Sequence, residues 1–348
     1  MVTLGTDAHK RSHTVVAADA QGRQLGQVTV TATSEGHLRA LVWAGQWPER
    51  TWAIEDCRHL SRRLERDLLA AGERVVRVPP KLMGIARRQA RTRGKSDPID
   101  ALAVARAALR EPDLPVACLD GVDRQVRLLV DHREDLVAER TRIQQRLRWH
   151  LHELEPGWEI PAGALDRSCW LDGVTARLAA QPGLVAELAG ELVERCRQLT
   201  GRVKELERQL ARLVPPLASS LLDLEGCGPL TAAKLIGEVA GMGRFRSRAA
   251  FAMHNGTAPI PVWSGNHQRH RLNRGGNRQL NVAMHRIAIT QLRLGGTGRA
   301  YVQRRLAAGD TKTEAIRALR RRISDQVYRR LRADEHQRHQ PTCRQPAA

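Results

Sequence analysis

Short apolar runs, broken by glycine or polar residues, dominate the first 80 residues of the chain. These runs predict β-strands at residues 2–7, 13–18, 24–31, 51–56 and 74–78. Apolar residues at helical spacing between and after the later strands predict helices at 34–47, 60–71 and 80–90. Three consecutive strands, followed by strands that alternate with helices, indicate an α/β domain with a mixed sheet and covering helices.

After residue 112 the period of the apolar residues becomes that of long amphipathic helices. Apolar residues recur at steps of three, four or seven from 122 to 154, interrupted by Arg133 and Arg140, and at alternating steps of four and three from 192 to 213. A heptad seam of this kind needs a partner helix. We therefore predict an antiparallel coiled-coil arm that supports a homo-oligomer, either a dimer or a tetramer.

The C-terminal third begins after Pro215 and Pro216, which end the second long helix. A Gly-x-Gly turn, Gly226 to Gly228, leads into an alanine-rich helix, a pattern typical of a helix-hairpin-helix element. An arginine-rich helix is predicted at about 311–332. The domains expected from these patterns are 1–112, 113–216 and 217–332, with a polar, disordered tail at 333–348.

Composition narrows the class of partner. The chain has 348 residues, 57 Lys and Arg against 37 Asp and Glu, and a formal net charge of +20, so we expect a polyanionic partner. Aromatic residues make up only 3%, which disfavours recognition of bases by stacking. The six cysteines contain no C-x-x-C pair, no apolar run approaches a membrane span and the N-terminus lacks a signal-peptide core. These features favour a protein of the cytoplasm.

Two carboxylates three residues apart follow a run of cations in "RTRGKSDPIDALAVARAALR", residues 91–110. Asp97 as N-cap, Pro98 at the first helical position and Asp100 in the first turn would make a good helix start, and that is the simplest interpretation. A second interpretation adds Asp7 on the first strand and Glu55 at the end of the fourth. The order of these four acids resembles that of a ribonuclease H-like nuclease core of the RuvC-like, Holliday-junction-resolvase branch.

Four clustered carboxylates repel one another unless a cation neutralises them. Their hard oxygen ligands select Mg²⁺ or Mn²⁺. Two such ions, about 4 Å apart, can stabilise both the attacking and the leaving oxygen of a phosphodiester. Helix capping and metal binding by Asp97 are compatible with each other.

Several motifs together resemble a known family. They are "GTDAHK", "WAIEDC", "RGKSDPIDALAVA", "LEGCGPLTAAKLIGEVAGMGRF" and "GTAPIPVWSGNHQRHRLNRGGNRQLN". In this order, and with the helical arm between them, they resemble the DEDD-type insertion-sequence transposases of the IS one-ten family, which are bridge-RNA-guided recombinases, over residues 3 to about 330. The resemblance implies a prokaryotic, nucleoid-associated enzyme that cuts and rejoins DNA, takes a structured guide RNA, and binds metal through Asp7, Glu55, Asp97 and Asp100.

The same resemblance implies a nucleophilic serine, Ser264, whose Oγ would attack the scissile phosphate and form a phosphoserine link. Trp263 stands where family members often have a further serine, and Asn273-Arg274 replaces a Ser/Thr-Lys pair. The basic residues Arg269, Arg271, Arg274 and Arg278 follow Ser264 and suit a loop on a phosphate backbone. Near the acids, we interpret Lys10, Arg91, Arg93 and Lys95 as groups that position phosphates.

Two rival functions remain open at this point. A junction-resolving endonuclease would use the four acids and a water molecule, and a non-catalytic basic scaffold would use the acids only as caps and ion-pair partners. Metal dependence separates the scaffold from both enzymes, and a covalent protein–DNA adduct separates the two enzymes. A metal site at His267 and His270, with His254 and His285 nearby, is disfavoured because no cysteine pair matches it and the neighbouring arginines would repel a cation.

Overall fold

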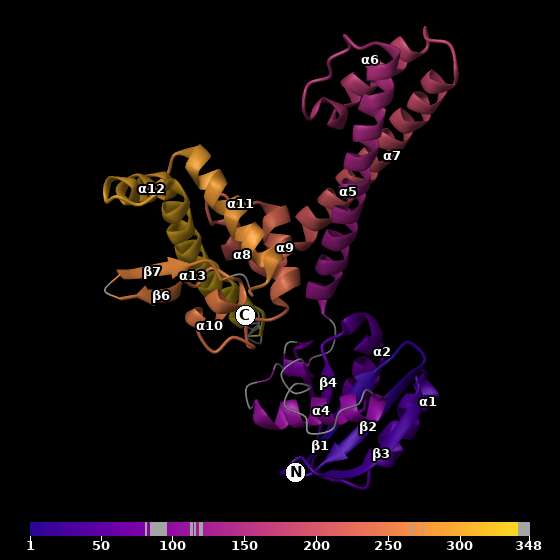
Figure 1. The fold of residues 1–348 in the computed structure, drawn as a ribbon, viewed down its shortest axis with the longest axis vertical. Coiled ribbons are helices and arrows are strands. Elements are labelled where there is room, and N and C mark those ends of the chain that lie inside the picture. Colours follow the sequence, from indigo (N-terminus) through magenta and orange to yellow (C-terminus); the bar gives the residue numbers. More distant parts are fainter. Residues whose placement is uncertain are drawn as a thin grey trace, which may run out of the picture. The chain divides into compact units, whose positions relative to one another are not determined.

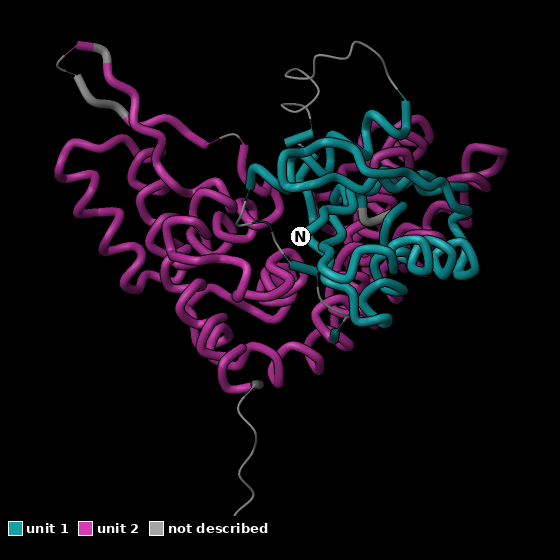
Figure 2. The backbone as a smooth tube through the Cα atoms, turned by 90° about the horizontal axis from the view of Figure 1, so that it is seen from below, with its two compact units in different colours: residues 1–121 teal, residues 122–348 magenta. Residues whose placement is uncertain are grey.

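The computed structural model describes residues 1–80, 82–83, 96–111, 114, 116–117, 121–265, 267–273 and 275–339. The chain forms two compact units, Met1–Gly121 (unit 1) and Val122–Ala348 (unit 2) (Figure 2). The boundaries at 112, 216 and 332 that the sequence suggests stay predictions.

Unit 1 is built on a five-stranded mixed sheet. Its strands are β1 (Val2–Ala8), β2 (Ser12–Ala18), β3 (Gln24–Thr31), β4 (Arg50–Glu55) and β5 (Val75–Val78). Their order is β3-β2-β1-β4-β5, with β1, β2 and β3 antiparallel and β4 and β5 parallel to β1. This is the arrangement of a ribonuclease H-like α/β domain. The predicted strands are confirmed, since each differs from the observed one by no more than a residue or so at its ends.

Helices cover both faces of this sheet (Figure 1). They are α1 (Ser34–Ala44), α2 (Arg58–Ala70) and α4 (Asp97–Arg110). Trp52 and Ile54 of β4 pack in one apolar cluster with residues of α1 and α2, whereas Ala53 packs in another with residues of α4. Successive strand residues point to opposite faces, so the odd-numbered positions of β4 face α4. Most of the helix predicted at 80–90 lies outside the described residues.

Unit 2 begins with a long helical arm. Its elements are α5 (Val122–Leu154), η1 (Ala164–Asp166), α6 (Ser168–Leu178) and α7 (Leu184–Leu213). Helices α5 and α7 lie side by side, with α6 at the end of the arm (Figure 1). Ion pairs join Arg133 to Glu207 and Glu139 to Arg195, so the two helices run antiparallel. Arg133 interrupts the apolar stripe because it carries one of these pairs. Supercoiling of the arm and its role in a homo-oligomer stay predictions.

The rest of unit 2 is mainly helical and shares one apolar core. Its elements are α8 (Pro215–Leu222), α9 (Pro229–Val239), α10 (Arg248–His254), β6 (Ile260–Ser264), β7 (His267–Arg271), α11 (Arg278–Leu294), α12 (Thr297–Ala307) and α13 (Lys312–His339). The β6–β7 hairpin is absent from the sequence-based prediction. Within the described part of the chain, no helix is both long enough and apolar enough to span a membrane.

Helix α13 continues through His339, past the point at which the sequence predicts a disordered tail. Residues 333–339 stay helical because two acids in this stretch, Asp334 and Glu335, accept hydrogen bonds from backbone N–H groups elsewhere in unit 2. The Ser220 backbone N–H donates to Asp334 over 3.1 Å, and the Met242 N–H donates to Glu335 over 2.8 Å. The predicted tail is therefore corrected as far as residue 339.

Candidate metal centre and nucleophile

Asp7 lies near the end of β1 and is almost fully buried, with 6% of its surface exposed. Gly5, two residues earlier on β1, allows α4 to pack directly against this strand. A Cβ on residue 5 would come within 2.1 Å of the Ala101 carbonyl oxygen of α4. Only glycine lets the helix approach the strand so closely. Asp7 is two residues further along the strand and so points to the same face, toward the N-terminal end of α4.

The start of α4 supplies two more acids. Asp97 is exposed, whereas Asp100 is buried, with 7% of its surface exposed. The N-cap is Ser96, with Asp97 as the first helical residue, so the prediction of Asp97 as N-cap is wrong. The shift has a simple cause: Pro98 suits the first turn, where a backbone N–H is not needed, and the chain becomes helical one residue before it. The Asp97 carboxylate instead lies toward His9.

His9, which the sequence analysis did not single out, lies between two of the carboxylates. Its Nε2 is 3.0 Å from an Asp7 oxygen and 3.4 Å from an Asp97 oxygen. One ligand atom from each of Asp7, His9 and Asp97 lies within 4.8 Å of the others. The position of His9 two residues after Asp7 puts it on the same side of the strand end, but no sequence pattern distinguishes such a lone histidine from a surface residue. The two carboxylates lie close enough together to share a single cation, and His9 contacts both of them.

The electrostatics of Asp7 reflect this crowding. Burial raises the pKa of the Asp7 carboxyl above its usual value, and the carboxylates of Asp100 and Asp97 raise it further, against a lowering by His9. Like charges held close together in a buried place disfavour the ionised form. A bound cation would reverse that penalty.

Glu55 ends β4, the parallel neighbour of β1, and lies one residue beyond the Thr6–Ile54 register pair. It shares a face with Ala53, so it points to the α4 side of the sheet, as Asp7 does. The two acids also act on one neighbour, since burial, Glu55 and, more weakly, Asp7 raise the pKa of the Cys57 thiol. The structure thus brings Asp7, His9 and Asp97 together. Strand register places Glu55 on the same face of the sheet, and Asp100 is close enough to Asp7 to raise its pKa.

Ser264 is the last residue of β6 and belongs to unit 2. It pairs with His267 across the turn of the β6–β7 hairpin, where Gly265 has a positive φ of 58°. Ser264 thus lies at the tip end of β6, and its side chain is outside the described part of the chain. The acids belong to unit 1.

The predicted basic residues are distributed as follows. Lys10 is exposed just beyond Asp7 and His9, Arg271 ends β7 and lines a pocket, and Arg278 begins α11. Arg91, Arg93, Lys95 and Arg274 lie outside the described residues, as does the side chain of Arg269.

Of the histidines near the hairpin, His254 is hydrogen-bonded to Arg244 over 2.8 Å, and burial together with that arginine lowers the His254 pKa to about 4.

Comparison with known proteins gives a consistent result. A family model for DEDD transposases of the IS110 type, described as a transposase, matches residues 4–156, and a model for the transposase IS116/IS110/IS902 family matches residues 218–303. The chain is 28% identical to the insertion element IS116 uncharacterized 44.8 kDa protein of Streptomyces clavuligerus, covering 95% of this chain and 94% of that protein. It is 29% identical to the insertion element IS900 uncharacterized 42 kDa protein of Mycobacterium paratuberculosis, covering 100% and 99%.

Among solved structures, RuvC of T. thermophilus in complex with a Holliday junction substrate is similar over 32% of this chain and 94% of that chain, with 16% identity and a TM-score of 0.25. The two family models describe one kind of protein and together span more than half of the chain, from the acidic sheet domain to the hairpin that carries Ser264. The chain therefore belongs to the IS110 family of DEDD transposases found in insertion elements.

Proposed function

We propose that this transposase cuts and rejoins DNA with a divalent cation held by Asp7, Glu55, Asp97 and Asp100 and with Ser264 as the nucleophile. The observation that carries the proposal is the group of Asp7, His9 and Asp97, in which two carboxylates lie around one histidine nitrogen and Asp7 is buried. A capping or ion-pairing role alone would not require a buried acid beside two further acids. This is why the non-catalytic scaffold is less well supported.

The donor set fits a hard divalent cation. Four of the candidate ligands are carboxylates, which favour Mg²⁺ or Mn²⁺ over softer ions. The raised pKa of Asp7 shows that its ionised form is disfavoured where no cation is bound. When bound, the cation would stabilise negative charge on the phosphate oxygens of the scissile link. His9 holds Asp7 and Asp97 in place through its Nε2, so it would act as a positioning residue.

Ser264 would form the covalent link to DNA. Its Oγ loses a proton and bonds to the scissile phosphorus, the bond from that phosphorus to a sugar oxygen breaks, and the departing oxygen takes up a proton. A hydroxyl of the joining strand then displaces the serine, which regains its proton. No net hydrolysis occurs, because the phosphodiester energy is kept in the phosphoserine bond.

A structured RNA would guide the reaction. The support is the family to which the chain belongs, together with its formal charge of +20, which suits a second polyanion beside DNA. Target and donor sequences would then be carried by pairing between nucleic acids and not by side chains.

The test is a cleavage assay on labelled DNA, with Mg²⁺ and RNA transcribed from the DNA that flanks the gene. We expect the wild type to give a protease-sensitive adduct whose peptide contains Ser264. Ser264→Ala should give neither adduct nor cleavage, whereas Ser219→Ala, an exposed serine on α8, should behave as wild type. Undiminished cleavage by Ser264→Ala would contradict the serine mechanism and favour a water-using endonuclease.

A further inference from the structure

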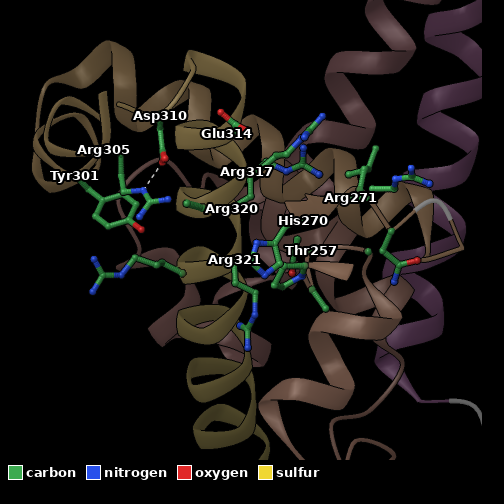
Figure 3. A pocket seen from close by; sticks show the side chains of 17 residues that line it. Thr257, His270, Arg271, Tyr301, Arg305, Asp310, Glu314, Arg317, Arg320 and Arg321 are labelled. Atoms are coloured by element: carbon green, nitrogen blue, oxygen red, sulfur yellow. Dashed lines mark ion pairs between the residues drawn. The ribbon is translucent and has the colours of Figure 1, made fainter. Parts of the chain in front are cut away.

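A pocket of about 760 Å³ lies in unit 2, away from the hairpin tip that carries Ser264. Three segments form it: the loop 256–259, the residues 270–273 at the end of β7, and the stretch from Tyr301 of α12 to Arg322 of α13. Figure 3 shows the Arg305–Asp310 pair at one side of the pocket and Arg271 at the other. We call it the arginine pocket, since six arginines line it: Arg271, Arg305, Arg317, Arg320, Arg321 and Arg322.

The two acids that line the arginine pocket are already engaged. Asp310 pairs with Arg305 over 2.5 Å. Glu314 accepts hydrogen bonds from the backbone N–H and hydroxyl of Thr311, over 3.0 and 2.6 Å, and so caps the start of α13. The lining therefore keeps a formal excess of positive charge.

Among the residues that the structure describes, several of these arginines have no carboxylate in ion-pair contact. Arg320 donates to the neutral Asn281 side chain, and its Nε is buried without a hydrogen-bond partner among the described residues. Arg322 lies 4.5 Å above the Tyr301 ring. In the part of the chain that the structure describes, neither Arg271 nor Arg317 has a carboxylate in ion-pair contact.

These cations also disfavour one another. Burial lowers the pKa of Arg320, and the neighbouring Arg317 and Arg278 lower it further. Arg278 begins α11 and was predicted from the sequence to contact phosphate. Guanidinium groups gathered around a cavity, with their repulsion unrelieved, suit an anion that accepts several hydrogen bonds at once, and a phosphate does so in bidentate geometry.

We propose that the arginine pocket is a binding site for the phosphodiester backbone of a nucleic-acid strand, held mainly by Arg317, Arg320 and Arg271. A strand is favoured over a free phosphate or nucleotide because exposed arginines, Arg317, Arg322 and Arg278, continue the positive charge from the cavity to the surface. The location adds a second reason. Arg271 pairs with Ile260 at the base of the hairpin, four residues and so about 13 Å along β6 from Ser264.

A strand held in the arginine pocket would therefore run toward the hairpin tip. This last step, by which the site aligns a strand for Ser264, rests on the proposed function. The binding itself does not, since it needs neither the acids nor the serine.

The test measures strand binding by fluorescence anisotropy at several salt concentrations. The full chain carries Asp7→Asn, so that no cleavage occurs, and the probes are labelled single-stranded DNA and RNA of one sequence. Removal of one arginine–phosphate interaction should reduce the slope of log K against log salt by about 0.7. We expect Arg317→Gln to show this reduction and a several-fold loss of affinity, and Arg317→Lys to retain most of the slope, because it keeps the charge.

Arg304→Gln is the matched control. Arg304 is an exposed arginine of α12 outside the pocket lining, so this variant removes the same charge from the same unit. Equal effects of Arg317→Gln and Arg304→Gln on both probes would overturn the proposal, since they would show general attraction without a site. Loss of affinity for only one probe supports it and identifies whether DNA or RNA occupies the pocket.

Competition by inorganic phosphate and adenosine monophosphate distinguishes a nucleic-acid strand from a small anion as the ligand of the pocket. If either displaces the labelled strand from the wild-type arginine pocket at micromolar concentration, the site is one for a small anion and the proposal is overturned. Failure of the binding test would leave the roles of Asp7 and Ser264 untouched, and failure of the cleavage test would leave the binding result standing.

Discussion

The proposed metal ligands Asp7, Glu55, Asp97 and Asp100 form what we call the acidic cluster of unit 1. This cluster and the arginine pocket of unit 2 both concentrate like charge, but the chain builds them differently. Asp7 stands on a strand and Asp97 and Asp100 on the first turn of a helix packed against it, so short side chains are fixed by rigid backbone. The arginine pocket gathers long side chains from three segments. Burial raises the pKa of Asp7 and lowers that of Arg320, and neighbouring like charges add to both shifts, so both side chains disfavour their charged forms.

The difference indicates what each site can bind. Short, fixed carboxylates define a small volume, as a metal ion of definite radius requires. Long guanidinium side chains can adjust to an extended anion such as a nucleic-acid strand. The acidic cluster should therefore govern chemistry, and the arginine pocket should govern affinity and its dependence on salt.

The largest expected effect separates these two roles. Asp7→Asn should reduce DNA cleavage by at least about 10³-fold, or about 4 kcal/mol, because it removes the charge of a proposed metal ligand while keeping the side-chain shape. Arg317→Gln should reduce cleavage only as far as it weakens strand binding, so saturating DNA should restore it. The measurement is single-turnover cleavage at rising DNA concentration. A cleavage rate of Asp7→Asn within tenfold of wild type would remove the distinction.

The second expected effect is a loss of stability where β1 packs on α4, the two elements that carry Asp7, Asp97 and Asp100. Gly5→Ala should destabilise the packing of β1 on α4 by about 3 kcal/mol, at the upper end for overpacking, because the new Cβ meets the backbone of Ala101 and Ala105. Hydrogen exchange of β1 and α4 peptides in the full chain measures this locally. Gly26→Ala is the control, since its Cβ would meet only the rings of Trp43 and Trp47, at 3.5 and 3.6 Å. Equal protection in both variants would show that the close approach is not required.

The smallest expected effect is the pH dependence of the stability of unit 1. It comes from His13, a buried histidine on the face of the sheet opposite to the acidic cluster. His13 is buried with its ring stacked 5.2 Å from that of His37, and burial, then His37 and His9, lower the His13 pKa to about 4. The folded-state pKa lies below the unfolded one, so stability is complete above about pH 6.5 and is lost as pH falls through 4. Between pH 7 and pH 5 this loss should be about 2 kcal/mol.

Hydrogen exchange of β2 peptides, corrected for the intrinsic pH dependence, checks this pH effect. His13→Gln should remove most of the loss, and His152→Gln, at an exposed position of α5, should leave it unchanged. An unchanged slope in His13→Gln would mean that other groups in unit 1 carry the pH dependence.

The sequence predicts unit 1 better than unit 2. The five strands are confirmed because β-branched and apolar residues alternate with clear breaks, and strand parity then places Asp7 and Glu55 on one face. His9 was missed because a lone histidine beyond a strand end carries no pattern. The β6–β7 hairpin was missed because its residues, such as His267 and Arg271, are polar and lack the apolar alternation that marks a half-buried strand.

The arginine pocket could not be predicted for a related reason. Arginines are frequent throughout the chain, so their sequence positions do not show which ones converge. Arg271 and Arg317 are separated by two helices, and only the packing of α11, α12 and α13 brings their segments together. The end of α13 was misplaced because Asp334 and Glu335 stabilise it through backbone groups distant in sequence.

Titration of the full chain with Mn²⁺, followed by the paramagnetic resonance of the free ion, tests the proposed metal centre most directly. Wild type and Arg317→Gln should bind Mn²⁺ with equal, saturable affinity. Asp7→Asn should bind at least about 100-fold more weakly, because loss of a ligand exceeds the roughly 10–100-fold effect of changing a group behind one. Equal affinity of Asp7→Asn and wild type would contradict the assignment of the acidic cluster as the metal centre.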